Sequence, residues 1–398
     1  MKKEHLNGLE ILRYFLGVYI VLYHTMHYAV MPYFATRMVG MGFIASSTFF
    51  ILSGFILSYV YLKGNGTSDI ILKDTNKNFL LKRFANLYPI HIFSLILTII
   101  VVSTIGYLMI MEKDSLSSFN YVMYDSNNYT PIERLHHFMD NKELVIAFIM
   151  NALMIQSWNP YYLTFNAPAW SISTLFFMYI LFPFIAPKLS KIKSPFKALF
   201  TTNIIYIAFP VLFISLNLFD MPYTGIINRN PLVRLPEFIA GILLCNIFFY
   251  IKNKGWVLGK GFALYSILFI LLSFYLADRF LANPDLITKS GNAPYYLLHT
   301  GLLLIPECLL ILLFSMIKIN NEKAIHYLKL LGGASLPMFA LHIPVYLIFT
   351  RAEYYFLKEN SLIFYPLYLV IITLICIYFQ KYIVVKTRDW ILKNTIQK

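Results

Sequence analysis

Two side chains in the first apolar run of the chain, Arg13 and His24, have types and a spacing that suit chemistry inside a membrane. They are 11 residues apart, about three helical turns, so a helix would carry both on one face roughly 16 Å apart. Ionisable groups at membrane depth are costly and usually have a function. A cation near the inner surface, aligned with a deeper imidazole, suits an anionic donor whose reactive end reaches a possible base.

Both residues also have a structural interpretation. Arg13 could extend its guanidinium to the headgroups, and His24 could be a helix-packing histidine with its hydrogen bonds satisfied. His24 is harder to explain in this way, because it lies too deep to reach water unless the bundle supplies a cavity. His27, one turn further out, could line the exit from that cavity, although packing is the simpler role.

The elements that must position these side chains are membrane helices. Of the 398 residues, 59% are hydrophobic and 13% are charged, whereas a soluble domain has about 25% charged residues. A shorter run at 143–158 predicts one interfacial or re-entrant helix within a long loop at 109–167. Runs of spanning length occur at 9–30, 41–62, 84–108, 168–187, 199–218, 231–251, 261–278, 294–317, 330–350 and 362–380.

The predicted fold is therefore all-α: a polytopic membrane protein with about ten transmembrane helices and one short re-entrant or interfacial helix. No polar stretch is long enough to build a separate soluble domain, so residues 1–398 are expected to form one membrane-embedded domain. The three cysteines lie in apolar runs at no metal-like spacing, which predicts packing thiols and neither a disulfide nor a metal site.

The loop charges predict the orientation. With ten spans and an inside N-terminus, 22 of the 33 lysines and arginines fall in inside segments and 9 in outside segments. Eleven spans would leave 12 inside against 19 outside. The excess favours ten spans with both termini in the cytoplasm. Because the basic residues lie in short loops, the net charge of +14 indicates topology rather than nucleic-acid binding.

Several blocks, together with Arg13 and His24, resemble the acyltransferase-3 family of integral-membrane acyltransferases. In chain order they are "FFILSGF" at 49–55, "LLKRFANLYP" at 80–89, "AWSISTLFFMYILFP" at 169–183, "PLVRLPEFIAGILL" at 231–244 and "LGGASLPMFALHIPVY" at 331–346. Each block is weak alone, but the set keeps the family's order over nearly the whole chain. The chain departs from the family's pattern at Ser47, where an aspartate is often found, at Asn86, usually an arginine, and at Leu175, in many members a glutamate.

The resemblance implies an O-acyltransferase of the cell membrane that moves acetyl or another short acyl group from cytoplasmic acyl-CoA to a hydroxyl of an envelope or exported polysaccharide. Acetyl-CoA would be the acyl donor substrate. The expected partners are acyl-CoA, a glycan acceptor and the lipid bilayer, with no nucleic acid. His24 would be the general base, Arg13, Lys82 and Arg83 would bind the donor's phosphates, and the candidate acceptor contacts are Trp170, Ser173, Arg234, Glu237 and His342.

Alternatives remain for several of these roles. Lys82 and Arg83 also fit an ordinary positive-inside signal, and Arg234 and Glu237 could simply neutralise each other at i,i+3. His342 falls near the depth of His24, so the two could face one cavity. For the whole chain, a transporter or flippase of a glycan or lipid-linked intermediate suits ten helices with polar groups near the midplane, although no convincing repeat relates the two halves. A catalytically inactive scaffold is a third interpretation.

Overall fold

The computed structural model describes residues 5–25, 33–64, 69–111, 119–125, 130–256, 259–289, 291–356 and 361–396, and His27 lies outside these ranges. The described chain is almost entirely helical, as predicted. Its helices are α1 (Asn7–Thr25), α2 (Tyr33–Val39), α3 (Phe43–Tyr61), α4 (Asn76–Met111), α5 (Asn141–Ala152), α6 (Trp170–Leu189), α7 (Pro195–Ser215), α8 (Tyr223–Arg229), α9 (Pro231–Asn253), α10 (Lys260–Leu281), α11 (Ala293–His299), α12 (Leu304–Ser315), α13 (Glu322–Phe356), α14 (Ser361–Phe379) and α15 (Val385–Ile396).

Nine helical stretches of the described residues are long and apolar enough to cross a membrane, which confirms a polytopic fold. They correspond to the predicted spans except the first. That span forms α1, whose described part is 19 residues long. Its polar residues, Asn7, Glu10, Arg13 and His24 among them, lower its mean hydropathy below that of the other nine stretches. The outer helices α7 and α10 expose apolar side chains such as Phe200, Leu268 and Leu272, as expected of a lipid-facing surface.

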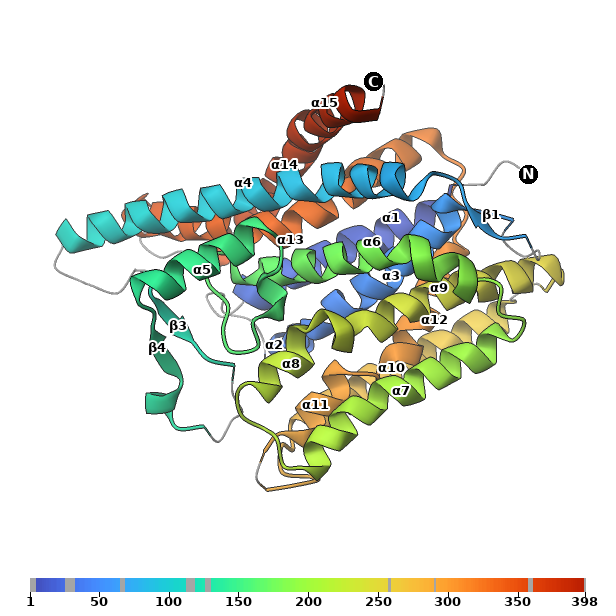
Figure 1. Ribbon diagram of the computed structural model, residues 1–398, viewed down its shortest axis with the longest axis horizontal. Helices are drawn as coiled ribbons and strands as arrows, with labels where there is room; N and C mark the ends of the chain where they lie inside the picture. The colour runs from blue at the N-terminus through green and yellow to red at the C-terminus, as the bar shows by residue number, and fades with distance from the viewer. Residues whose placement is uncertain are drawn as a thin grey trace.

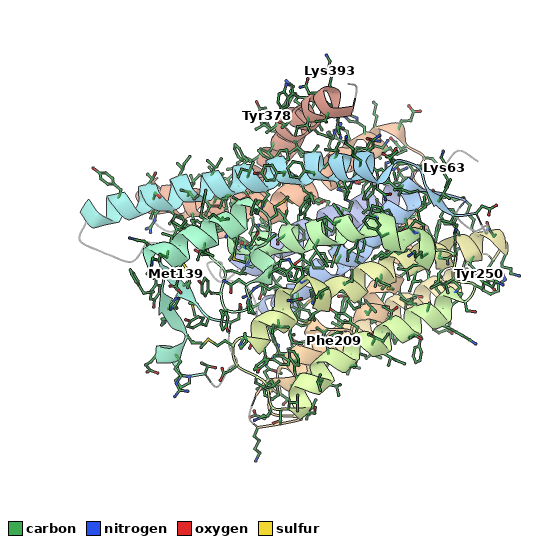
Figure 2. All side chains as sticks on the ribbon, in the orientation of Figure 1. Lys63, Met139, Phe209, Tyr250, Tyr378 and Lys393 are labelled. Atoms are coloured by element: carbon green, nitrogen blue, oxygen red, sulfur yellow. The ribbon has the colours of Figure 1, made fainter. Side chains whose placement is uncertain are left out.

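The helices form an elongated bundle in which α1 packs along α13 and α3 packs along α9 (Figure 1). Helix α4 lies across α6, α13 and α15, and α7 covers α9. The start of α1, the end of α3, the α6–α7 link and the end of α9 lie at one end of the bundle. Figure 2 shows Lys63 and Tyr250 at that end and Met139 at the opposite end.

Glycines allow the central helices to approach closely. A Cβ on Gly241 of α9 would lie 1.9 Å from the carbonyl oxygen of Ile51, and one on Gly54 of α3 would lie 2.2 Å from that of Phe238. Small residues at such crossings are how membrane helices bring their backbones together. The α3–α9 pair therefore forms the tightly packed centre against which the other helices lie.

The structure differs from the predicted span at 294–317, which is broken into α11 and α12. Gly301 lies at the break with a φ of +89°, a conformation that glycine adopts at little cost. The predicted helix at 362–380 also continues, through the π-helical segment Gln380–Val384, into α15. Cys245, Cys308 and Cys376 are buried in α9, α12 and α14.

The loop between α4 and α6 contains the short helix that the run at 143–158 predicts. Helix α5 has 12 residues and begins with a capping box made by Asp140 and Glu143. It is too short to span a bilayer. His91 of α4 holds its end through a 2.6 Å hydrogen bond to the Asn151 carbonyl. Before it, the strands β3 (Tyr121–Met123) and β4 (His136–Phe138) form a small antiparallel pair, and the pair β1 (Leu62–Lys63) and β2 (Ile71–Leu72) lies between α3 and α4.

Candidate active site

Arg13 and His24 share the face of α1 that packs along α13. Gly17, between them, is so close to α13 that its Cβ would lie 3.0 Å from the Met338 sulfur and 3.2 Å from the Ser335 Cα. Further out, the ring of His24 lies 5.1 Å from the ring of His342, centroid to centroid. The predicted shared face therefore exists, and it is turned toward a neighbouring helix.

The two histidines lie in an aromatic and polar environment made by α1, α13 and α14. The ring of Tyr23 meets that of His24 edge-on at 4.8 Å. Beside His24, the Thr25 hydroxyl is 2.7 Å from the Tyr365 hydroxyl. Tyr368 donates a 2.9 Å hydrogen bond to the main-chain carbonyl of His342. Helix α14 thus fixes both helices at the level of the histidine pair.

The loop before α6 is hydrogen-bonded to α13 at a carbonyl that a proline leaves without a helical donor, near the level of the histidine pair. Pro344 has no N–H, so the carbonyl of Ala340, four residues earlier, loses its helical partner. The Asn166 side-chain amide donates to that carbonyl at 2.6 Å. A buried backbone carbonyl is thereby satisfied, and the segment that leads into Trp170 is held against α13.

The three predicted donor contacts lie toward the end of the bundle that carries the N-terminus. Arg13 forms a 3.0 Å ion pair with Glu10 of its own helix, and Lys82 forms a 2.8 Å pair with Asp74. Arg83 has no acidic partner among the described residues. It donates to the Tyr61 hydroxyl and lies over the Tyr61 ring, and its Nε is buried with no hydrogen bond to a described residue.

Tyr179 of α6 lies within the electrostatic influence of two of these cations. The charges of both Arg83 and Arg13 act on its hydroxyl, which is also hydrogen-bonded to Ser53 of α3.

A cavity of about 560 Å³ lies at the same end, between α1, α9 and α12, and is lined in part by Trp256, Lys252 and Lys318. Basic side chains therefore surround this end of the bundle and attract anions to it.

Arg234 and Glu237 belong to a second polar cluster, at the α11–α12 break. Their side chains are each 1% exposed and 3.1 Å apart. Arg234 also donates to the Ser47 hydroxyl at 2.8 Å and to the His299 carbonyl, and Tyr206 donates to Glu237 at 2.8 Å. The predicted pairing of the two residues is present. In this arrangement their side chains expose no surface to an acceptor.

Trp170 and Ser173, at the start of α6, lie in the centre of the bundle. The Trp170 ring meets that of Phe50 edge-on at 5.9 Å, and the Ser173 hydroxyl bonds to the Ser157 hydroxyl and the Met154 carbonyl, each at 2.7 Å. A cavity of about 10 Å³ is lined there by Ser46 and by residues of three of the five blocks: Phe49, Phe50, Ser171, Ile172, Leu175, Leu336 and Phe339. These three of the blocks that carry the resemblance thus meet in space.

Several residues of these clusters escaped the sequence-based prediction. Glu307 is buried in α12 and interacts electrostatically with Glu237 and Arg234. An acid inside an apolar run is itself a signal, so Glu307 could have been found. Tyr206, Tyr179 and Asn166 carry no such signal, because a tyrosine or asparagine in a membrane protein is ordinary until its partner is known.

Comparisons with known proteins identify the family of the chain. A family model described as an acyltransferase domain matches residues 6–381. A protein of Rhizobium radiobacter named protein 2 in the picA locus is 30% identical over 136 residues, covering 33% of this chain and 59% of that protein. Acyltransferase MdmB of Streptomyces mycarofaciens is 26% identical over 168 residues, covering 39% of this chain and 34% of that protein.

Each of these matches therefore spans less than two thirds of the relative's own length. No solved structure gives a significant match. The family match, by contrast, extends over nearly all of the residues that form the bundle and both polar clusters. This chain belongs to the acyltransferase-3 family.

Proposed function

We propose that this protein is a membrane O-acyltransferase. It would move an acetyl or other short acyl group from acyl-CoA in the cytoplasm to a hydroxyl of an envelope or exported polysaccharide. The observation that carries the proposal is the position of His24: an imidazole inside the bundle, beside a second imidazole, on the helix face that also bears Arg13. Family membership supports the acyl-transfer chemistry.

His24 acts as the general base in this mechanism. Imidazole suits that task because its unperturbed pKa of about 6.5 leaves much of it neutral near pH 7. His24 takes the proton of the acceptor hydroxyl while the oxygen attacks the thioester carbonyl. The carbon–oxygen bond forms, the carbon–sulfur bond breaks, and the proton passes from His24 to the departing thiolate. Ester and free coenzyme A are the products.

Arg83 is the strongest candidate for binding the donor. Coenzyme A carries several phosphate charges, and the planar guanidinium matches phosphate geometry. Arg13 and Lys82 already have carboxylate partners, whereas Arg83 has a buried Nε without a described acceptor. Arg13 and Lys82 then contribute mainly through their charge.

Replacing Arg83 by glutamine is expected to raise the KM for acyl-CoA by about 10-fold or more, since a hydrogen bond to a charged group contributes about 1.5–3 kcal/mol. The measurement is the initial rate of acyl transfer at varied donor concentration. Lys77→Gln is the matched control, because Lys77 is an exposed cation earlier on the same helix, α4. An unchanged donor KM in Arg83→Gln would remove Arg83 from the donor site.

The orientation of the chain follows from the same proposal. The predicted inside loops lie at the end of the bundle where α4 begins (Figure 1), and Arg83 is in the first turns of that helix. Positive-inside charge makes that end cytoplasmic. The acceptor then approaches from the other end, where α2, α5, α8 and the β3–β4 pair lie. A donor on one side and an acceptor on the other meet at the level of His24.

A transporter remains the alternative function, and the break between α11 and α12 is the observation that favours it, since transporters use broken helices to bind substrates. Here, however, the carbonyl of His299 at the break accepts hydrogen bonds from Arg234 and Tyr206. That carbonyl is therefore satisfied within the protein, as a structural feature requires.

Purified protein supplied with acetyl-CoA and a polysaccharide acceptor is expected to release coenzyme A and to form acetyl ester on the acceptor in equal amounts. Thiol release and mass analysis of the acceptor are the measurements. Omission of the acceptor is the control and should suppress most of the release. Uptake of glycan into vesicles without thiol release would support the transporter instead.

A further inference from the structure

The tautomer of His342 follows from its hydrogen bond. Its Nδ1 lies 2.7 Å from the main-chain carbonyl oxygen of Met338, one helical turn earlier. A carbonyl oxygen has no proton to donate, so Nδ1 must carry the hydrogen. A neutral imidazole has one N–H, and its other nitrogen is then an acceptor. In the neutral side chain, Nε2 of His342 therefore presents a lone pair.

That lone pair has no partner among the described residues. His342 is 0% exposed, and its Nε2 is buried without a hydrogen bond to a described group. A buried acceptor left unsatisfied costs about 1–3 kcal/mol. If His342 served only for packing, this free-energy cost would have no compensating benefit. A phenylalanine would fill the same space and would bury no unsatisfied acceptor.

The ring in contact with His342 is that of His24. The centroids are 5.1 Å apart and the planes are inclined by 32°, a separation at which ring edges meet. On the other sides, Tyr368 bonds to the main-chain carbonyl of His342, and Asn166 bonds to the carbonyl of Ala340. These contacts hold the α13 backbone and use neither nitrogen of the His342 ring.

We propose that His342 is a positioning residue for His24, with its Nε2 accepting the N–H of the His24 ring. This inference rests on the proposed function, in which His24 is the base. The hydrogen bond would place the proton of neutral His24 on the nitrogen that faces His342. The other His24 nitrogen would then carry the lone pair that takes the acceptor's proton.

The hydrogen bond between the two histidines also accommodates the positive charge that forms on His24 during transfer. When His24 takes the hydroxyl proton, it becomes an imidazolium with two N–H groups. One of them donates to His342 Nε2 and the other returns its proton to the thiolate. His342 keeps its own Nδ1–H on the Met338 carbonyl throughout. No net proton is consumed, and no acidic residue is needed to orient the base.

The first test is His342→Phe in the full-length protein. The variant keeps a planar ring of similar size and removes the acceptor nitrogen. We expect a fall in kcat of about 10²-fold, with the KM values for donor and acceptor within about twofold. His342→Gln keeps an acceptor near the Nε2 position and should recover at least about 10-fold of that loss. His326→Phe is the matched control, since His326 is an exposed histidine at the start of the same helix, and its kcat should stay within about twofold.

The second test does not depend on turnover. In protein labelled with ¹⁵N-histidine, His24 is assigned by the signal lost in His24→Gln. Wild-type His24 should show one tautomer, and His342→Phe should show a mixture or the other tautomer. If the tautomer is unchanged in His342→Phe, or if the variant raises an acceptor KM and leaves kcat intact, the inference fails. If wild-type protein transfers no acyl group while the tautomer shift is seen, the proposed function fails and the histidine pairing stands.

Discussion

Replacing His24 by alanine is expected to lower the rate of acyl transfer by about 10²–10⁴-fold, the usual contribution of a general base. Alanine supplies no group that could take the proton of the acceptor hydroxyl. The donor site is formed by other elements, α4, α6 and the inner part of α1, so the KM for acyl-CoA should change little. The measurement is ester formation by purified variant and wild type at saturating donor.

The control for this prediction is His326→Ala. His326 is exposed at the start of α13, and its loss should leave the rate within about twofold. Both variants should insert into the membrane and purify as wild type does, because His24 is only partly buried. Acceptor modification at the wild-type level by His24→Ala would contradict the assignment of the base.

Replacing Arg234 by methionine is expected to cause the largest loss of stability, about 3–5 kcal/mol, because it leaves the Glu237 carboxylate buried without its cation. It also leaves the His299 carbonyl with one donor fewer at the α11–α12 break and leaves the Ser47 hydroxyl without the guanidinium. The measurement is thermal unfolding of the detergent-solubilised protein, with the yield of inserted protein as a second readout.

A double-mutant cycle separates the ion pair from the rest of the cluster. Glu237→Gln alone leaves Arg234 unpaired, whereas Arg234→Met combined with Glu237→Gln removes both charges and should recover a large part of the stability. If Arg234→Met unfolds at the wild-type temperature but binds the acceptor poorly, the pair contacts acceptor, as the sequence had suggested, and the structural role is wrong.

The family pattern at this cluster has a physical explanation. Where many members have an aspartate, this chain has Ser47, whose hydroxyl accepts from Arg234. A serine provides no charge, so the negative partner of the arginine comes from Glu237, one turn along the same helix. With serine at position 47, Arg234 therefore still has a negative partner in Glu237, and the Ser47 hydroxyl still provides it with a hydrogen-bond acceptor.

The break between α11 and α12 shows where sequence patterns fail. The run at 294–317 is apolar enough on average that hydropathy treats it as one helix. What stabilises the break is a hydrogen bond from Arg234, 65 residues away in the chain, to the carbonyl of His299. No local pattern encodes that contact. Gly301 indicates that a break at this position would cost little conformational energy, but it does not indicate that a break occurs.

By itself, the sequence determined the class of fold, the short helix α5 and the common face of Arg13 and His24. These depend on local quantities, namely the hydropathy of a run and the period of a helix, which neighbouring residues set. Only the tertiary structure decided that this face meets α13 and that His24 lies against His342. Such pairings depend on which helices lie side by side. That choice follows from the packing of the whole bundle, in which residues hundreds of positions apart compete for the same partners.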